Sequence, residues 1–381
     1  MQHRRRGRGR RFAGGVVRPA GVATLLLSLS ACGLRTDVAD GVETAPDSRA
    51  ASRSIVCADR GYLAASGSTA QQNAMAHWTE EYQSACPGVK IRYTPNGSGA
   101  GVAQFLRGAT QLGGTDGALT PDEVARSTEV CPGGRAIDLP MVGGPIAIGY
   151  NLDGVDGLVL DAAALARIFD SEITVWNDPA IRRLNPGVKL PPTPISAVHR
   201  SDGSGTTQNF NAYLAGAAPR HWPYEEDKAW RAKGGVSAAG SDGLAAHVRT
   251  TSGAIGYFEL SFAKRAEIPT VRLDTGGPEP VQVSAESASL GIAAAGVAGD
   301  GNDMTLRFDY RNQAAGAWPI VLVTYEIVCD RGNPPDSLPA LKSFLTYMAG
   351  AEGQNGLRGI HYAPLPAELA AAVQQVVSSL S

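Results

Sequence analysis

A strand, a glycine-containing turn and a helix follow one another three times near the start of the chain. The first unit runs from "GYLAASGST" into "AQQNAMAHWTEEYQSA", whose apolar residues Met75, Trp78 and Tyr82 recur at helical spacing. The second runs from "VKIRYT" through "NGSGAG" to "GVAQFLRGA", and the third from "QLGGTD" to "LTPDEVARS", with Pro121 in the first helical turn. This alternation predicts an α/β fold with a parallel sheet.

Two longer β-rich runs bracket the middle of the chain. "IDLPMVGGPIAIGYN" ends near residue 151, and "WPIVLVTYEIVC" ends at Cys329 and precedes an amphipathic helix. A chain of 381 residues is too long for one ordinary hydrophobic core. We therefore expect two lobes joined by two crossovers, with a cleft at the hinge. Lobe 1 comprises residues 54–145 plus 320–381, and lobe 2 comprises residues 146–319.

The first 31 residues have the composition of an export signal peptide. They contain seven arginines and no lysine or acid, and they end in the short apolar run "GVATLLLSLSA". The next residue completes "LSAC", which resembles a bacterial lipobox and predicts lipidation of Cys32; an ordinary secretory signal with a chance cysteine is the alternative. Either the Sec or the twin-arginine route would suit the leader. Residues 32–53 are expected to form the lipidated N-terminus and a flexible tether, because they are small and polar.

Charge and cysteine content narrow the function classes. Without the leader the chain has 27 basic and 36 acidic residues, a formal charge of −9, which argues against nucleic acid as a partner. Four cysteines remain if Cys32 is lipidated, and an even number in an exported chain favours two disulfides over free buried thiols. We expect no metal and no cofactor, because neither the cysteines nor the histidines have ligand spacing. These residues are Cys57, Cys86, Cys131, Cys329, His77, His199, His221, His247 and His361.

Glycine and hydroxyl residues precede three of the expected helices. They are "SGST" (66–69), "NGSG" (96–99) and "DGSGTT" (202–207), the last before the expected helix "QNFNAYLAGA". A helix N-terminus offers unpaired N–H groups and partial positive charge, and therefore favours anions. Each motif alone is better explained by an ordinary capped helix. Together with Arg200 and Asp116 they indicate an oxyanion site, although none is a Walker A loop.

These motifs resemble those of the phosphate-binding proteins of bacterial ABC phosphate importers, the PstS family. The resemblance covers residues 60–366 and also includes "LGGTDGALT", "IFDSEITVWNDPAIRRLNPGVKLP" and "HYAPLP". It implies a type II periplasmic-binding-protein fold, in which two lobes with mixed sheets close on one dehydrated phosphate. It also implies a lipid-anchored receptor on the outer face of the cell membrane, which delivers phosphate to the permease subunits of the importer.

The resemblance also assigns the phosphate ligands by motif. Asp116 is expected to accept the phosphate proton, Arg200 to supply positive charge, and Asp202 to orient Arg200. The remaining expected ligands are hydrogen-bond donors from both lobes: Thr69, Ala70, Ser98, Ser204, Gly205 and Thr206. Position 70 is Ala where the family more often has a bulkier apolar residue, but its expected role uses only the backbone N–H.

An acceptor carboxylate in the site would distinguish phosphate from sulfate. Phosphate keeps a proton at neutral pH and can donate it to Asp116, whereas sulfate has the same shape and no proton. An unprotonated oxyanion against a buried carboxylate costs several kcal/mol, on the order of a thousandfold in affinity. Arsenate should compete, because it is protonated like phosphate.

The family fold further implies disulfides between Cys57 and Cys86 and between Cys131 and Cys329, at the end of lobe 1 away from the cleft. We expect no enzymatic activity, because Ser204 has no evident base beside it except His199. Three other functions remain as alternatives: a phosphatase or phosphotransferase, a receptor for another oxyanion such as sulfate, tungstate or arsenate, and a structural surface protein.

Overall fold

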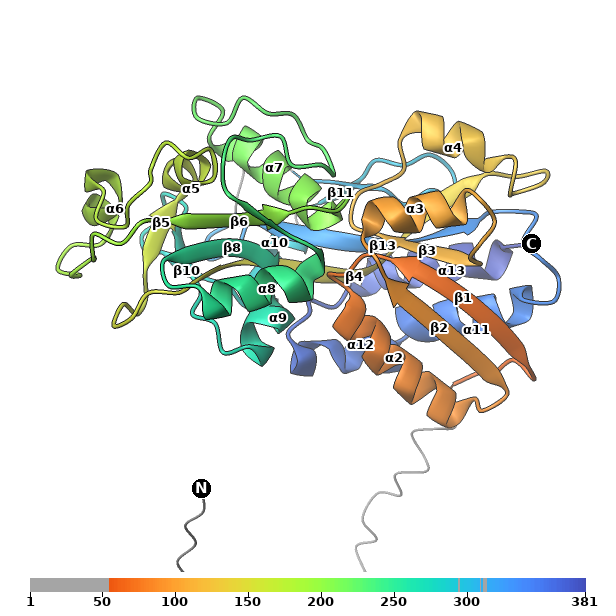
Figure 1. Cartoon of the computed structure of the whole chain (residues 1–381). Coiled ribbons are helices and arrows are strands. Elements are labelled where there is room, and N and C mark those ends of the chain that lie inside the picture. The colour runs from red at the N-terminus through yellow and green to blue at the C-terminus, as the bar shows by residue number, and fades with distance from the viewer. Residues whose placement is uncertain (1–54, 294, 309, 311–313) are drawn as a thin grey trace, which may run out of the picture. The chain divides into compact units, whose positions relative to one another are not determined.

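An eight-stranded mixed sheet with the strand order β2-β1-β3-β13-β4-β8-β6-β7 organises the protein (Figure 1). The computed structural model describes residues 55–381 except 294, 309 and 311–313. The expected signal peptide, Cys32 and the tether lie outside the described residues. The α/β class predicted from the alternating sequence pattern is confirmed.

The strands of the three strand–turn–helix units, β2, β1 and β3, lie next to one another at one end of the sheet. β1 pairs in parallel with β2 and with β3, as the alternation requires. The capping box of Thr120 and Glu123 begins the third helix, with Pro121 at its first position. The elements are β1 (Gly61–Gly67), α2 (Gln72–Ala85), β2 (Val89–Pro95), α3 (Ser98–Phe105), β3 (Leu112–Thr115) and α4 (Pro121–Ser127).

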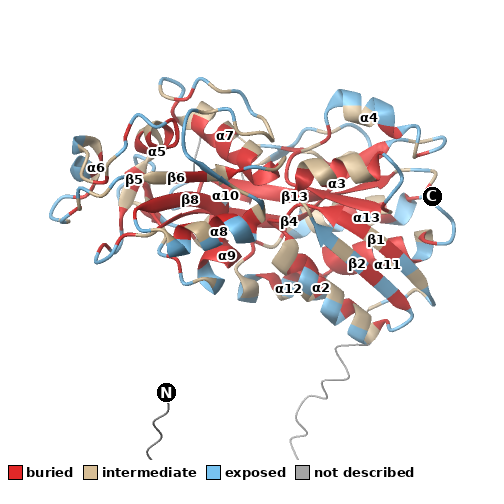
Figure 2. Ribbon diagram, in the orientation of Figure 1, coloured by how far each residue is buried: buried red, intermediate tan, exposed pale blue. Residues whose placement is uncertain are grey.

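The two long β-rich runs form the centre of the sheet. β4 (Ala136–Tyr150) pairs antiparallel with β13 (Val321–Cys329) as far as Pro145, and from Ile146 it pairs with β8 (Ala254–Glu259). Every residue of these three strands is buried, and the strands are red throughout in Figure 2. Burial on both faces explains why their sequences are nearly continuous apolar runs instead of alternating ones.

The middle of the chain continues the sheet through β8, β6 and β7. Here β6 pairs in parallel with both β7 and β8. The elements of this region are β5 (Val159–Asp161), α5 (Ala162–Phe169), α6 (Pro179–Leu184), β6 (Ser196–Arg200), α7 (Gly205–Ala217), β7 (Val236–Ala238), α8 (Gly240–Thr250), α9 (Leu260–Arg265), β9 (Arg272–Asp274), β10 (Val281–Gln282), α10 (Ala285–Ala293), β11 (Gly296–Val297) and β12 (Leu306–Arg307).

The C-terminal helices return to the side of the sheet that carries β1. They are α11 (Leu338–Ala349), α12 (Ala351–Asn355), the short 3-10 helix η1 (Leu357–Ile360) and α13 (Ala367–Ser379). One apolar core includes Trp78 of α2 and Phe344 of α11, and another includes Trp176 and Phe258. The first of these cores is therefore built from both ends of the chain.

Two helices begin three residues earlier than their sequence patterns predict. α3 begins at Ser98 and α7 at Gly205, whereas the patterns place the starts at residues 101 and 208. Ser204 explains the second difference, because its side chain accepts a hydrogen bond from the Thr207 N–H (3.2 Å) and so caps the helix. The glycine and hydroxyl residues therefore lie within the first turns of these helices.

Two disulfides lie in the part of the protein that contains β1 and β13. Cys57 is bonded to Cys86 at the end of α2, and Cys131 to Cys329 at the end of β13. These are the two pairs that the family resemblance implied. The second bond connects the segment after α4 with a strand that is 198 residues away in sequence.

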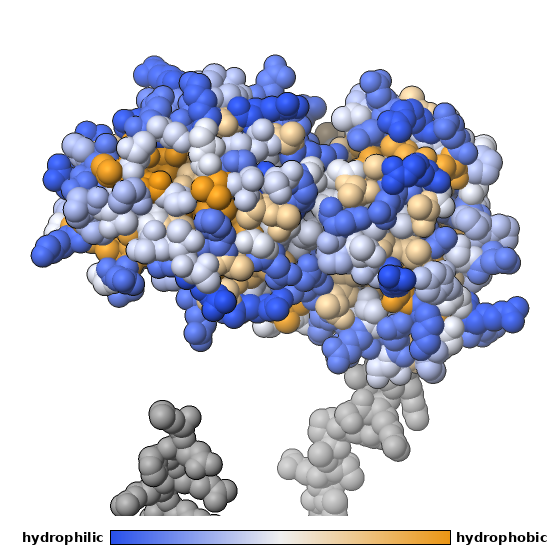
Figure 3. All heavy atoms as spheres, in the orientation of Figure 1, coloured by the Kyte–Doolittle hydropathy of each residue, from blue (hydrophilic) through white to orange (hydrophobic). Residues whose placement is uncertain are grey.

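Polar residues cover most of the face shown in Figure 3, and hydrophobic residues form small separate groups on it. Within residues 55–381, apart from the gaps given above, no helix has the length and apolar composition needed to cross a membrane.

We predict that the Cys131–Cys329 bond contributes more to stability than the Cys57–Cys86 bond. A cross-link restricts the unfolded chain more when it closes a longer loop, and the sequence separations are 198 and 29 residues. Replacing Cys131 and Cys329 by Ala should lower the free energy of unfolding by about 5 kcal/mol. The same replacement of Cys57 and Cys86 should lower it by about 4 kcal/mol. Denaturant unfolding of both double variants measures this. A larger loss in the Cys57/Cys86 variant would contradict the prediction.

Candidate anion-binding site

The starts of α3 and α7 meet at the centre of the molecule. The Gly99 N–H donates to the Gly203 carbonyl oxygen (2.9 Å), and the Gly205 N–H donates to Ser98 Oγ (3.1 Å). Gly97 has a φ of +96°, a conformation that a residue with a side chain rarely adopts. Two helix N-termini, separated by over a hundred residues in sequence, are thereby placed side by side.

Asp116 lies immediately after β3 and faces both helix starts. Its Oδ1 accepts from Thr324 Oγ1 (2.8 Å), and its Oδ2 lies 3.4 Å from Ser98 Oγ. Its backbone carbonyl accepts from the side chain of Asn209 in α7 (2.7 Å). The carboxylate is therefore held in place by β13 and α3, while its backbone is tied to α7.

The Asp116 side chain is enclosed, with only 3% of the residue exposed. Burial raises the pKa of this carboxyl, because the charged form loses hydration. Hydrogen bonds from Ser68, Thr324 and Ser98 and the charge of Arg200 oppose the shift. A carboxyl in this setting can accept a hydrogen bond from a protonated ligand, because it is not neutralised by an ion pair.

Arg200 ends β6 and is also 3% exposed. Its Nε donates to Asp202 Oδ1 (2.7 Å), and its Nη2 donates to Asp202 Oδ2. Partial burial acts to raise the pKa of Asp202, but the Arg200 guanidinium lowers it overall. Asp202 Oδ1 also accepts from the Gly240 N–H (3.0 Å), so the acid links the arginine to the start of α8.

The loop after β1 supplies Thr69 and Ala70, both buried. Thr69 Oγ1 is hydrogen-bonded to Ser241 Oγ (2.8 Å) in α8, and the Ala70 N–H donates to Ser68 Oγ (3.0 Å). The Ser68 side chain also interacts with Asp116. The loop is thus connected both to Asp116 and to the helix that Asp202 contacts.

Thr206 lies in the first turn of α7. Its Oγ1 is buried and has no hydrogen-bond partner among the described residues. A buried hydroxyl without a partner is costly, and it is a free donor for a ligand. The structure gathers all the expected ligand residues around Asp116 and the starts of α3, α7 and α8: Thr69, Ala70, Ser98, Asp116, Arg200, Ser204, Gly205 and Thr206.

His199 is not placed as a base for Ser204. Its ring stacks on Trp230 with centroids 5.0 Å apart, and its Nδ1 lies 3.1 Å from the Arg200 carbonyl oxygen. The Ser204 side chain accepts from the Thr207 N–H in its capping role. The arrangement therefore presents a capped helix start and not a nucleophile beside its base.

Four residues that support the site were not singled out from the sequence. Thr324 holds Asp116, Ser241 holds Thr69, and Asn209 holds the Asp116 backbone. Tyr257 accepts from the Arg200 N–H (3.3 Å) and contacts Thr207 Oγ1 (2.7 Å). Only Thr324 had a sequence signal, as a polar residue inside an apolar strand.

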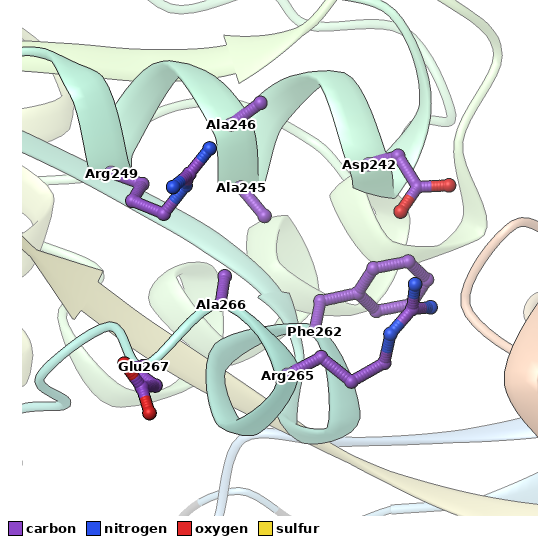
Figure 4. A pocket seen from close by; sticks show the side chains of 8 residues that line it. All are labelled: Asp242, Ala245, Ala246, Arg249, Phe262, Arg265, Ala266 and Glu267. Carbon is purple, nitrogen blue, oxygen red and sulfur yellow. The ribbon is translucent and has the colours of Figure 1, made fainter. Parts of the chain in front are cut away.

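A separate hollow of about 330 Å³ lies between α8 and α9 (Figure 4). None of the expected ligand residues lines it. Two of its residues reach α2: Asp242 Oδ2 accepts from Gln72 Nε2 (2.9 Å), and Arg265 Nη1 donates to Asn73 Oδ1 (2.6 Å). The hollow therefore adjoins contacts between α2 and the helices that follow β7 and β8.

Comparison with known proteins first defines the class. A family model described as a PBP superfamily domain matches residues 53–352. The fold is that of the periplasmic binding proteins: a high-affinity periplasmic phosphate-binding protein, PfluDING, solved with bound phosphate, has a TM-score of 0.68. It is 20% identical and covers 84% of this chain and 93% of its own.

Curated relatives then define the family. Phosphate-binding protein PstS 2 of Mycobacterium tuberculosis is 43% identical over 359 residues, covering 92% of this chain and 95% of the relative. Phosphate-binding protein PstS 3 of Mycobacterium leprae is 42% identical, covering 89% of this chain and 91% of the relative. The chain belongs to the PstS family of phosphate-binding proteins, whose members are receptors and not enzymes.

We predict that Gly205→Ala disrupts the contact between α7 and Asp116. A Cβ at Gly205 would lie 2.5 Å from Asp116 Cβ and 2.7 Å from Ser98 Oγ, so the helix start must move. Overpacking of this kind costs about 1–3 kcal/mol, which thermal unfolding measures. The matched control is Gly243→Ala in α8, where a Cβ meets nothing within 4 Å. Equal stability changes in the two variants would contradict the close approach at Gly205.

Proposed function

We propose that this protein is an extracytoplasmic receptor that binds one inorganic phosphate at the starts of α3 and α7 and delivers it to an ABC importer. The observation that carries the proposal is the site itself, where a buried cation, a buried carboxylate and an unpaired Thr206 hydroxyl are gathered at two helix N-termini. Such a set suits a dehydrated oxyanion that still bears a proton. The names of the relatives support phosphate as that oxyanion.

In this proposal most ligands are neutral dipoles. Thr69, Ser98 and Thr206 donate hydroxyl or backbone hydrogen bonds, and Ala70, Ser204 and Gly205 contribute from the adjoining backbone and helix start. Arg200 supplies the single positive charge, and Asp202 fixes the direction of its planar group. Oriented dipoles can hold a desolvated anion without a matching number of cations.

Phosphate would enter by hinge opening between two lobes, residues 54–145 with 320–381 and residues 146–319. The boundary is supported by β4, which changes partner from β13 to β8 between Pro145 and Ile146. The expected ligands are buried in the described conformation, so exchange with solvent requires the lobes to separate. The contacts of α2 with Asp242 and Arg265 would break in that motion.

The remaining parts of the proposal concern the chain before residue 55. Lipidation of Cys32 would anchor the protein to the outer face of the cell membrane, and residues 33–53 would tether it. The permease subunits of the importer would then receive phosphate from the closed form. Mass spectrometry of the membrane fraction tests the anchor, since a lipidated Cys32 fragment is expected after removal of the leader.

The function is tested by calorimetric titration of the purified full chain after removal of bound ligand. Tight 1:1 binding of phosphate with no sulfate signal is the expected result, and arsenate should compete. If phosphate produces no heat and no shift in melting temperature, the proposed function is wrong. If phosphate and sulfate bind equally, the protein is still an anion receptor, but Asp116 does not discriminate between the two anions.

We predict that Asp116→Asn reduces discrimination between phosphate and sulfate. The amide can donate a hydrogen bond to sulfate and lacks the negative charge that repels it. The ratio of the two dissociation constants should fall by at least about tenfold. Asp170→Asn is the control, because Asp170 is a buried acid that instead accepts from Tyr224 (2.6 Å). An unchanged ratio in Asp116→Asn would refute the selectivity mechanism.

A further inference from the structure

A second buried carboxyl, Glu326 of β13, lies near Asp116. It is fully buried, and neither of its oxygens has a well-formed hydrogen bond to any described residue. The proposed function does not use it. A buried acid without a cation is costly in its charged form, so its protonation state requires an explanation.

The surroundings of Glu326 are a small polar cluster over Gly114 of β3. Gly114 is the residue opposite Glu326 in the β3–β13 pairing. A Cβ on Gly114 would lie 2.2 Å from Gln71 Nε2 and 2.7 Å from Tyr93 Oη, so these two side chains occupy the space above it. Glu326, Gln71 and Tyr93 therefore share one buried space.

The cluster offers little to stabilise a negative charge on Glu326. Gln71 Nε2 donates to Tyr93 Oη (3.1 Å), and Tyr93 Oη donates to the Ser68 carbonyl (2.7 Å). The Gln71 amide acts on Glu326 as a donor that favours the charged form, but it does not reach hydrogen-bond geometry with either carboxyl oxygen. A carboxylate here would therefore be poorly stabilised, whereas a protonated carboxyl carries no charge to stabilise.

The cluster also contacts the loop expected to hold the anion. Ser68 receives the Tyr93 hydrogen bond at its carbonyl, while its Oγ accepts from the Ala70 N–H (3.0 Å). Gln71 follows Ala70 directly in the chain. A charge that appears on Glu326 would therefore act on this loop through Gln71 and Tyr93, and on a bound anion through space.

We propose that Glu326 is a positioning residue that carries a proton beneath the phosphate site, and that loss of this proton weakens phosphate binding as the pH rises. This inference rests on the proposed function. The titratable groups that face Glu326 are Asp116 after β3 and Tyr93 of β2, while the neighbouring Leu139 of β4 is apolar. No cation among the described residues is found to offset its charge.

The direction of the pH effect follows from linkage. Burial, with a contribution from the charge on Asp116, raises the pKa of Glu326 to about 8, and Gln71 opposes the shift. Bound phosphate adds negative charge, so the complex holds the Glu326 proton more tightly than the free protein does. By reciprocity, phosphate binds more tightly to the protonated form. The contribution of Glu326 to affinity is then constant below about pH 7 and falls above about pH 8.

We predict that Glu326→Gln removes this loss of affinity. The Gln amide has the shape of the protonated acid, but it cannot ionise. Between about pH 7 and about pH 9 the wild-type chain should lose up to about tenfold more phosphate affinity than Glu326→Gln. Phosphate itself ionises equally in both experiments, so the comparison between the two proteins cancels that effect.

Asp138→Asn is the matched control. Asp138 is another fully buried acid, and burial raises its pKa to about 7. Its Oδ2, however, accepts from the Leu119 N–H (2.9 Å), and no hydrogen bond joins it to a described residue of the loop 66–71. Its pH profile should match that of the wild-type chain. Calorimetric dissociation constants for phosphate, measured with the full chain at each pH, provide the comparison.

The outcomes separate this inference from the proposed function. If the wild-type chain does not bind phosphate at neutral pH, the proposed function fails. If it binds and Glu326→Gln has the same pH profile, or if the folded variant binds far more weakly at neutral pH, the role of Glu326 is wrong. If the variant does not fold, calorimetry of the wild-type chain in two buffers at about pH 9 should show proton uptake on phosphate binding, and its absence overturns the inference.

Discussion

The antiparallel pairing of β4 with β13 is the contact on which the rest of the structure depends. It joins two strands that are far apart in sequence, Ala136–Tyr150 and Val321–Cys329, and it leaves β4 free to pair with β8 beyond Pro145. β13 also pairs with β3, and this second pairing brings Thr324 to Asp116 and places Glu326 opposite Gly114. The support for the site and the junction between the two sets of strands are therefore one structural element.

The central strands β4, β8 and β13 are fully buried, and this burial changes the pKa of the acids they contain. Burial raises the pKa of Glu259 and Glu326 to about 8 and that of Asp138 to about 7, whereas hydrogen bonds and Arg200 oppose the shift at Asp116. Proton-bearing acids stabilise the fold most below their unfolded-state pKa, and this contribution is lost as the pH rises through the folded-state pKa. Asp116 differs because it has donors on both oxygens.

Sequence patterns predicted the α/β class, the strand–turn–helix units and the motifs that meet at the site. Local periodicity can do this because each unit is short and is bounded by glycine or proline. It placed the starts of α3 and α7 three residues late, and at α7 the reason is that capping by Ser204 extends the helix beyond its apolar pattern. It did not find Ser241, Asn209 or the Gln71–Tyr93–Glu326 cluster, because these contacts depend on how distant strands pair.

The charge balance of the site explains how strong binding could remain reversible. Arg200 is already paired with Asp202, so its positive charge is largely offset before any anion arrives. A bound oxyanion would then be stabilised mainly by the dipoles of helix starts and hydroxyls, which come from both sides of the hinge. In the proposed mechanism, separation of the two sides would remove about half of these donors at once, and water would replace them. Release would then follow from opening alone, with no change of charge in the protein.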